Sequence, residues 1–222
     1  MACADPEGRF DEFNEKKSHV QAENDAGLQL DAEIDASNDA NGQSVDAAVE
    51  AATDSSSTCE LVTQGGLTQY YLLSISTKLI PKLPILTLVE FTISTQANPP
   101  TISIHAQPLD AKDRRTAVGD PIIGGPYPIN SDGSFVADFG TITVPGKANP
   151  ISGGDIVTTL ILSAQAGGLC KPANFICGPV SGMLTAPIAG DLSGGSNFTF
   201  QAIVNEQEYP VPAIDCAKTL AP

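Results

Sequence analysis

The chain has no tryptophan, few other aromatic residues and little positive charge. Its 222 residues include four tyrosines and eight phenylalanines, and 11 Lys and Arg stand against 26 Asp and Glu. Aromatic rings supply much of the contact area of binding surfaces, so their scarcity argues against a sugar-binding platform. Nucleic-acid binding needs several cations on one face, and the only basic cluster is Lys112, Arg114 and Arg115. We therefore expect no nucleic-acid partner.

Long apolar runs and enzyme motifs are also missing. The most apolar segment, residues 67–93, is interrupted by two lysines, two prolines and Glu90, whereas a membrane-spanning helix needs about 20 apolar residues in succession. The sequence contains none of the signatures of serine hydrolases, nucleotide-binding loops or zinc proteases. These absences lead us to expect neither a cofactor nor a transmembrane helix.

The negative charge is concentrated in the first quarter of the chain. Residues 1–58 hold 14 acidic and three basic residues, a net charge of −11, which leaves −4 of the total of −15 for residues 59–222. A segment so charged and so poor in large apolar side chains cannot offset the entropy lost on ordering its backbone. We expect residues 1–58 to be a disordered acidic linker and residues 59–222 to form one domain.

The sequence of residues 59–222 predicts an all-β domain. Val89, Phe91 and Ile93 alternate with polar residues, which is typical of a strand with one buried face. Short segments of this kind are separated by turns rich in Gly, Pro, Asp and Asn, such as residues 131–134. The parity of the apolar residues slips at Gly140, which predicts a β-bulge. We predict an antiparallel β-sandwich of about 8–10 strands, with a closed β-barrel as the alternative.

Five cysteines are present, and four of them lie in the predicted domain. Cys59, Cys170, Cys177 and Cys216 allow three pairings. We favour Cys170–Cys177, because a short proline-containing loop joins them, and this leaves Cys59–Cys216. Two disulfides imply an oxidising compartment. A zinc site is the alternative, but the domain has no Cys-x-x-Cys pair and a single histidine, so no metal site is expected there.

The fifth cysteine, Cys3, lies in the start Met1-Ala2-Cys3-Ala4-Asp5. This start, followed by an Asp/Ala-rich linker, resembles a surface lipoprotein of Gram-negative bacteria, of uncharacterised type, just after its signal peptide has been removed. The leucine and the apolar segment that precede the cysteine in that family are absent here. The resemblance implies a lipid on Cys3, attachment to a membrane, and a place on the outer membrane, at the cell surface or in the periplasm. The alternative is an ordinary cysteine in a disordered tail.

A weak calcium motif lies within the predicted linker. Alternating oxygen-bearing side chains before a glycine resemble the beginning of an EF-hand loop. The twelfth position of such a loop would be Ala48 instead of glutamate, so diffuse attraction of cations is the favoured interpretation. The candidate ligands are Asp35, Asp39 and Asn41.

Candidates for catalysis are few. His105 shares the polar parity of its strand, and Glu90 does the same in the preceding one. Most of the other carboxylates adjoin Gly or Pro, where aspartate commonly serves a turn. We therefore expect a non-catalytic surface or interaction module of the cell envelope with a protein or other envelope partner. The alternatives are a lipoprotein that binds a small apolar ligand, and a secreted hydrolase with two converging carboxylates.

Overall fold

The computed structural model describes residues 59–67, 70–205 and 207–222. These residues begin at Cys59, where the sequence predicts the start of the domain. The predicted disordered linker lies outside them, and so do Cys3 and the calcium candidates Asp35, Asp39 and Asn41.

The described residues form antiparallel strands, as the alternation of apolar side chains predicts. Two short 3-10 helices, η1 (Gln64–Gly66) and η2 (Gly146–Ala148), lie in connections. The strands are β1 (Tyr70–Ser76), β2 (Ile85–Ser94), β3 (Thr101–Pro108), β4 (Ile122–Pro128), β5 (Phe135–Val144), β6 (Ile156–Ala164), β7 (Phe175–Ser181), β8 (Met183–Ala186), β9 (Gly190–Asp191) and β10 (Asn197–Ile203).

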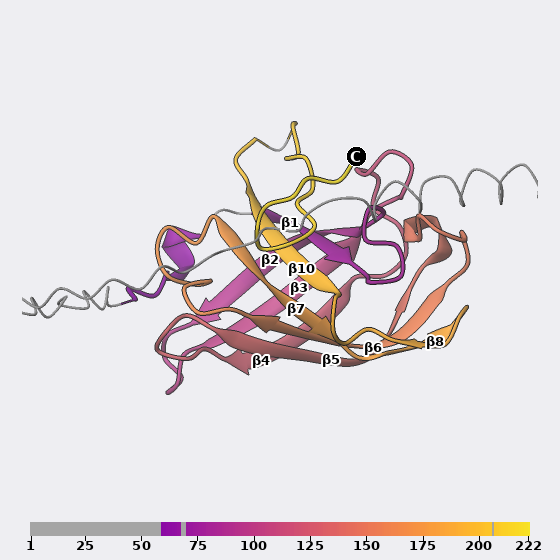
Figure 1. Ribbon diagram of the computed structural model, residues 1–222. Coiled ribbons are helices and arrows are strands. Elements are labelled where there is room, and N and C mark those ends of the chain that lie inside the picture. Colours follow the sequence, from indigo (N-terminus) through magenta and orange to yellow (C-terminus); the bar gives the residue numbers. More distant parts are fainter. Residues whose placement is uncertain (1–58, 68–69, 206) are drawn as a thin grey trace, which may run out of the picture. The chain divides into compact units, whose positions relative to one another are not determined.

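These ten strands form one sheet that folds over on itself as a sandwich (Figure 1). Their order is β4-β3-β2-β1-β10-β7-β6-β8-β9, and β5 pairs with β6 off this path. The sheet does not close into a barrel, because β4 and β5 share only the bridge between Ile129 and Phe135 beside their hairpin turn. Pro126 and Pro128 leave β4 short of backbone donors, which suits an unpaired edge. The predicted sandwich is confirmed, and the barrel alternative is wrong.

The alternation seen in the sequence corresponds to the two faces of the sheet. Val89, Phe91 and Ile93 of β2 are buried, whereas Glu90 between them is exposed. The predicted bulge at Gly140 is also present. Between Asp138 and Thr141 the pairing of β5 with β6 shifts, and Gly140 has a φ of 63°, which a residue with a side chain rarely adopts.

Aromatic rings fill the space between the two layers. The ring of Phe91 lies 4.8 Å from that of Tyr71 and 4.9 Å from that of Phe200, centre to centre, and Phe198 lies 5.3 Å from Phe200. All four side chains are almost fully buried. Such large buried surfaces dominate the free energy of a core, and they occupy the interior that a barrel would use to hold an apolar ligand.

A second, smaller apolar cluster lies on the outer face of the sheet. Leu72, Leu86, Leu109 and Ile203 are buried there, with Tyr209 packed against them. The cover is the C-terminal strap, which we define as residues 207–222, and Figure 1 shows it crossing over β1 and β10. Within the strap, the backbone of Ala213 is hydrogen-bonded to the side chains of Thr199 and Gln201. The strap explains why β1 is apolar on both faces.

Candidate functional site

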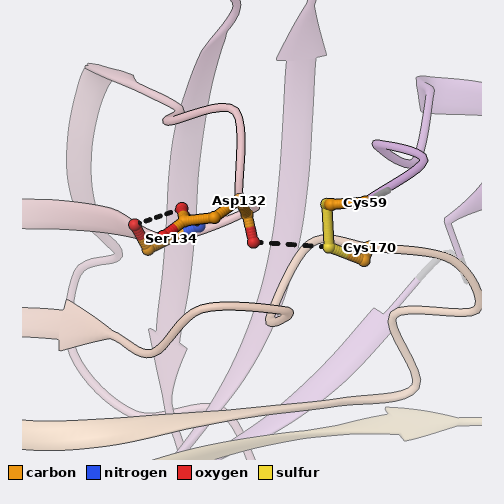
Figure 2. Close-up of a disulfide and its surroundings, with 4 residues drawn as sticks. All are labelled: Cys59, Asp132, Ser134 and Cys170. Carbon is orange, nitrogen blue, oxygen red and sulfur yellow. Dashed lines mark hydrogen bonds between the residues drawn. A yellow bond between two sulfur atoms is a disulfide. The ribbon is translucent and has the colours of Figure 1, made fainter. Parts of the chain in front are cut away.

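The four cysteines of the domain pair differently from our expectation. Cys59 is bonded to Cys170 (Figure 2), and Cys177 is bonded to Cys216. The predicted pairs Cys170–Cys177 and Cys59–Cys216 are therefore wrong. The two disulfides themselves are present, and they indicate an oxidising, extracytoplasmic environment.

Backbone pairing at the beginning of the domain explains the first bond. Leu61 forms a β-bridge with Cys170, and the N–H of Lys171 donates to the carbonyl oxygen of Glu60 at 2.9 Å. The first described residues thus run beside the turn that comes after β6. The carbonyl oxygen of Asp132 also lies 3.4 Å from the Sγ atom of Cys170, as Figure 2 shows. Cys170 is therefore held beside Cys59 by backbone pairing between segments distant in sequence. The shortness of the loop to Cys177, on which the predicted Cys170–Cys177 bond relied, does not decide the pairing.

The loop between Cys170 and Cys177 is anchored in the core instead of folding back. The buried hydroxyl of Tyr71 donates to the carbonyl oxygen of Ala173 at 3.0 Å, and Ala173 itself is buried. Cys177 then lies on the outer face of β7, since its neighbours Ile176 and Gly178 are buried on the inner face. That outer position is where the C-terminal strap passes with Cys216.

His105 and Glu90 lie side by side on exposed positions of β3 and β2, as their parity predicts. In the described ranges, no group of three or more His, Cys, Asp or Glu side chains is placed to hold a metal ion. Of the tyrosines, Tyr71 is buried, and Tyr127 packs edge-on against Phe139 at 5.9 Å between ring centres. Tyr71 and Tyr127 therefore contribute to the packing of the fold.

Four aspartates of the described residues have a pKa below the usual value for a carboxyl group, and each accepts hydrogen bonds from a residue two to four positions further along the chain. For Asp132, the hydroxyl and the N–H of Ser134 donate to its carboxylate and lower the pKa. The pKa of Asp113 is lowered in the same way by Thr116. The others are Asp191 and Asp215. Their carboxylates are engaged by backbone N–H groups, which agrees with the turn role expected from the sequence.

A groove at one end of the sandwich is the most distinctive site in the described part of the chain. It has a volume of about 550 Å³, within the range of small-molecule sites. Three connections enclose it, namely residues 77–84, 109–121 and 145–155. We call it the end groove, and its lining includes Leu83, Pro84, Leu86, Asp110, Lys112, Arg114, Lys147, Asn149 and Pro150.

Backbone hydrogen bonds hold the basic residues of the end groove in place. The N–H of Ala111 donates to the carbonyl oxygen of Lys147 at 2.9 Å, which joins two connections and brings Lys112 near Lys147. Arg114 has a φ of 60°, and its N–H donates to the carbonyl oxygen of Asp110 at 2.8 Å. Its guanidinium donates in turn to the carbonyl oxygen of Pro222 at 3.3 Å.

The third connection is fixed by a buried amide. Asn149 is 5% exposed, and its Nδ2 donates to the hydroxyl of Ser152 at 2.8 Å and to the carbonyl oxygen of Gly154 at 2.7 Å. Its Oδ1 accepts from the N–H of Ile151 at 2.9 Å. A satisfied buried amide of this kind rigidifies the loop around it. The wall of the groove is therefore formed before any ligand binds.

Among the described residues, Lys112 and Lys147 of the end groove form no ion pair, and the guanidinium of Arg114 is hydrogen-bonded to Pro222. The two ion pairs of the described residues lie outside the end groove. They join Lys78 to Asp191 at 3.5 Å and Lys171 to Glu60. A hollow of about 630 Å³ beside the Cys59–Cys170 bond contains this second pair and Asp132, so its lining has no unmatched cation. The end groove is the better site for an anionic group.

Sequence reasoning found only half of this site. It recognised the cluster of Lys112, Arg114 and Arg115 and found in it too little positive charge to bind nucleic acid. Lys147 joins the cluster through a pairing of connections 35 residues apart, from Lys112 to Lys147, that no periodicity reveals. The only sequence signal near Lys147 is the Asn149-Pro150 turn. It predicts a loop, but not which other loop lies beside it.

Comparisons of the chain with protein-family models, with curated proteins and with solved structures found no match. Within the described residues, no helix combines the length and the apolar character needed to cross a bilayer.

Proposed function

We propose that this protein is a non-catalytic interaction module of the bacterial cell envelope, held on a membrane by a lipid on Cys3. In this proposal residues 1–58 are an acidic tether that keeps the β-sandwich clear of the membrane. The sandwich carries the binding surface, and its partner is a protein or another component of the envelope.

The two disulfides are the observation that carries the proposal. Cys59–Cys170 fixes the beginning of the domain and Cys177–Cys216 fixes the C-terminal strap, so both ends of the domain depend on oxidation. Such bonds persist in exported proteins and are rare where thiols are kept reduced. Export is also what a lipidated Cys3 requires.

The composition of the end groove supports binding over chemistry. Its lining contains cations, apolar groups and a single carboxylate, Asp110, so the converging pair of a glycosidase is missing from it. The small apolar-ligand alternative has less support, since Phe91, Phe198 and Phe200 fill the space between the layers.

The mass of the intact protein, purified from native membranes, tests the proposal. We expect the added mass of acyl chains, located on Cys3 by fragmentation, and a rise of about four hydrogens on reduction of two disulfides. A Cys3→Ser variant should lose the acyl mass and move to the soluble fraction while keeping both disulfides. Free thiols in native material, or a wild-type protein without acyl chains in the soluble fraction, would contradict the proposal.

A further inference from the structure

Four connections lie at the same end of the sandwich, which we call the loop end. Antiparallel pairing places the β1–β2 connection (77–84) beside the β3–β4 connection (109–121). The pairing of Val157 with Ala186 adds the β8–β9 connection (187–189) next to the β5–β6 connection (145–155). Figure 1 shows this end at the right of the view, and the indigo beginning of the described chain at the opposite end.

The loop end gathers most of the basic residues of the domain. Six of the eight Lys and Arg of residues 59–222 lie there, against four of its 12 acidic residues. The rest of the domain therefore has two basic and eight acidic residues, a net charge of −6. The six are Lys78, Lys82, Lys112, Arg114, Arg115 and Lys147.

Three of the four acidic groups of the loop end are directed into their own loops, and the fourth, Asp120, is exposed. Asp110, Asp113 and Asp155 each accept a hydrogen bond from a backbone N–H of the loop end. The side chains of Lys82, Lys112, Arg115 and Lys147 are exposed instead. The cationic heads thus reach the solvent at a surface whose carboxylates are partly neutralised by N–H groups.

Apolar side chains protrude from three of the same four connections. Ile188 is 67% exposed, Leu79 is 52% exposed, Ile151 is 44% exposed and Leu83 is 39% exposed. Leu83 lines the end groove together with Lys112 and Lys147, so the apolar and basic groups form one surface.

The remaining members join this surface through close contacts. Leu79 lies next to Gly190, which is two residues after Ile188. A Cβ atom added to Gly190 would be 3.9 Å from the side chain of Leu79. Lys78 joins the β1–β2 connection to β9 and to the residue two positions after it, through Asp191 and through the carbonyl oxygen of Ser193 at 2.6 Å. The β1–β2 connection therefore lies against the β8–β9 hairpin on one side and lines the end groove on the other.

We propose that the loop end docks on an anionic lipid bilayer, with Leu79, Leu83, Ile151 and Ile188 in the interface and the cations on lipid phosphates. Exposed apolar groups surrounded by Lys and Arg are the composition of surfaces that lie on anionic membranes. The charge of −6 on the rest of the domain would turn the loop end toward such a surface. This inference gives the domain a membrane contact of its own, and it does not need a lipid on Cys3.

A bilayer suits this surface better than a folded protein partner. The four protruding side chains come from three connections, and each is at least 39% exposed, whereas a protein interface usually has a central packed core of apolar groups. Lipid headgroups adapt to such a surface, and the end groove offers room for one of them.

Vesicle sedimentation of the full chain with Cys3→Ser, which carries no acyl anchor, tests the docking. We expect binding to vesicles of phosphatidylcholine and phosphatidylglycerol in equal parts, and no binding to phosphatidylcholine alone. The added replacements Lys112→Gln and Lys147→Gln should weaken binding about fivefold for each lysine. The matched control, Lys171→Gln with Lys218→Gln, removes the same charge elsewhere and should change binding less than twofold.

A second pair of variants tests the apolar contact. Ile188→Asp should weaken sedimentation more than tenfold, whereas Val204→Asp, at a side chain that is 92% exposed and outside the loop end, should have the effect of its charge alone. Circular dichroism should show every variant folded. Absence of binding to the anionic vesicles, or equal losses from the two lysine pairs, would overturn the docking. Neither result would bear on lipidation of Cys3, which the mass measurement tests separately.

Discussion

The hydroxyl of Tyr71 donates a hydrogen bond of 3.0 Å to the carbonyl oxygen of Ala173 inside the core. This bond joins β1 to the loop between Cys170 and Cys177, two segments about 100 residues apart. The loop begins with a turn in which the N–H of Ala173 donates to the carbonyl oxygen of Cys170 at 2.8 Å, and the bond from Tyr71 anchors this turn in the core. We infer that this core contact, as well as the cysteines, favours the observed disulfide pattern.

Replacement of Tyr71 by phenylalanine should lower the free energy of unfolding by about 1–3 kcal/mol, because the buried carbonyl loses its donor. Tyr127→Phe is the matched control. Its hydroxyl donates to the carbonyl oxygen of Asp138 at 2.9 Å at an exposed site, where water can take over, so we expect a change below about 0.5 kcal/mol. Urea unfolding of both variants makes the comparison, and equal losses would show that burial of the bond is unimportant.

Mapping of the disulfides by chymotrypsin should distinguish the observed pattern from the one we expected from sequence. Cleavage after Phe175 separates Cys170 from Cys177. Without reduction, we expect the fragment with Cys170 to remain joined to the fragment with Cys59, and Cys177 to Cys216. Both masses should disappear in the reduced digest. A covalent link between the fragments on the two sides of Phe175 would contradict the structure.

The range of each interaction decides whether the sequence could predict it. The faces of β2 and the bulge at Gly140 were predicted correctly, because alternation and backbone conformation are local properties. The partners of Cys170 and Cys177 were not, since they are set by backbone pairings and core contacts between distant segments. Lys147 was missed as part of the end groove for the same reason. Local sequence patterns therefore predict where strands lie more readily than they predict which strands and loops lie next to one another.

Gly178 should not tolerate a side chain. It lies in β7 between β6 and β10, and a Cβ there would be only 1.9 Å from the carbonyl oxygen of Ser163. Gly178→Ala must push strands apart, and we expect a loss of about 1–3 kcal/mol or more in the free energy of unfolding. In Gly65→Ala, the new methyl group meets nothing within 4 Å, so its thermal midpoint should remain near that of the wild type. A Gly178→Ala protein as stable as Gly65→Ala would show that the packing here is looser than described.

The stability of the domain should fall as the pH drops below about 4. The lowered pKa values of Asp113, Asp132, Asp191 and Asp215 mean that the folded state favours ionised carboxylates, chiefly through hydrogen bonds from neighbouring groups. An unfolded chain has ordinary carboxyl groups with a pKa near 3.9, so it takes up protons first as acid is added. The stabilisation is therefore complete above that value and is lost as the pH falls toward and through the folded pKa values.

Urea midpoints measured between pH 3 and pH 6 check this dependence at one residue. Asp132→Asn removes the carboxylate that accepts from both the N–H and the hydroxyl of Ser134, so we expect a lower midpoint than wild type at pH 6. The difference should shrink toward pH 3, where the wild-type carboxyl group is increasingly protonated. Asp120→Asn corrects for the change in net charge, since it removes one carboxylate from another exposed loop. A difference that stays constant over this range after that correction would show that ionisation of Asp132 does not contribute to folding.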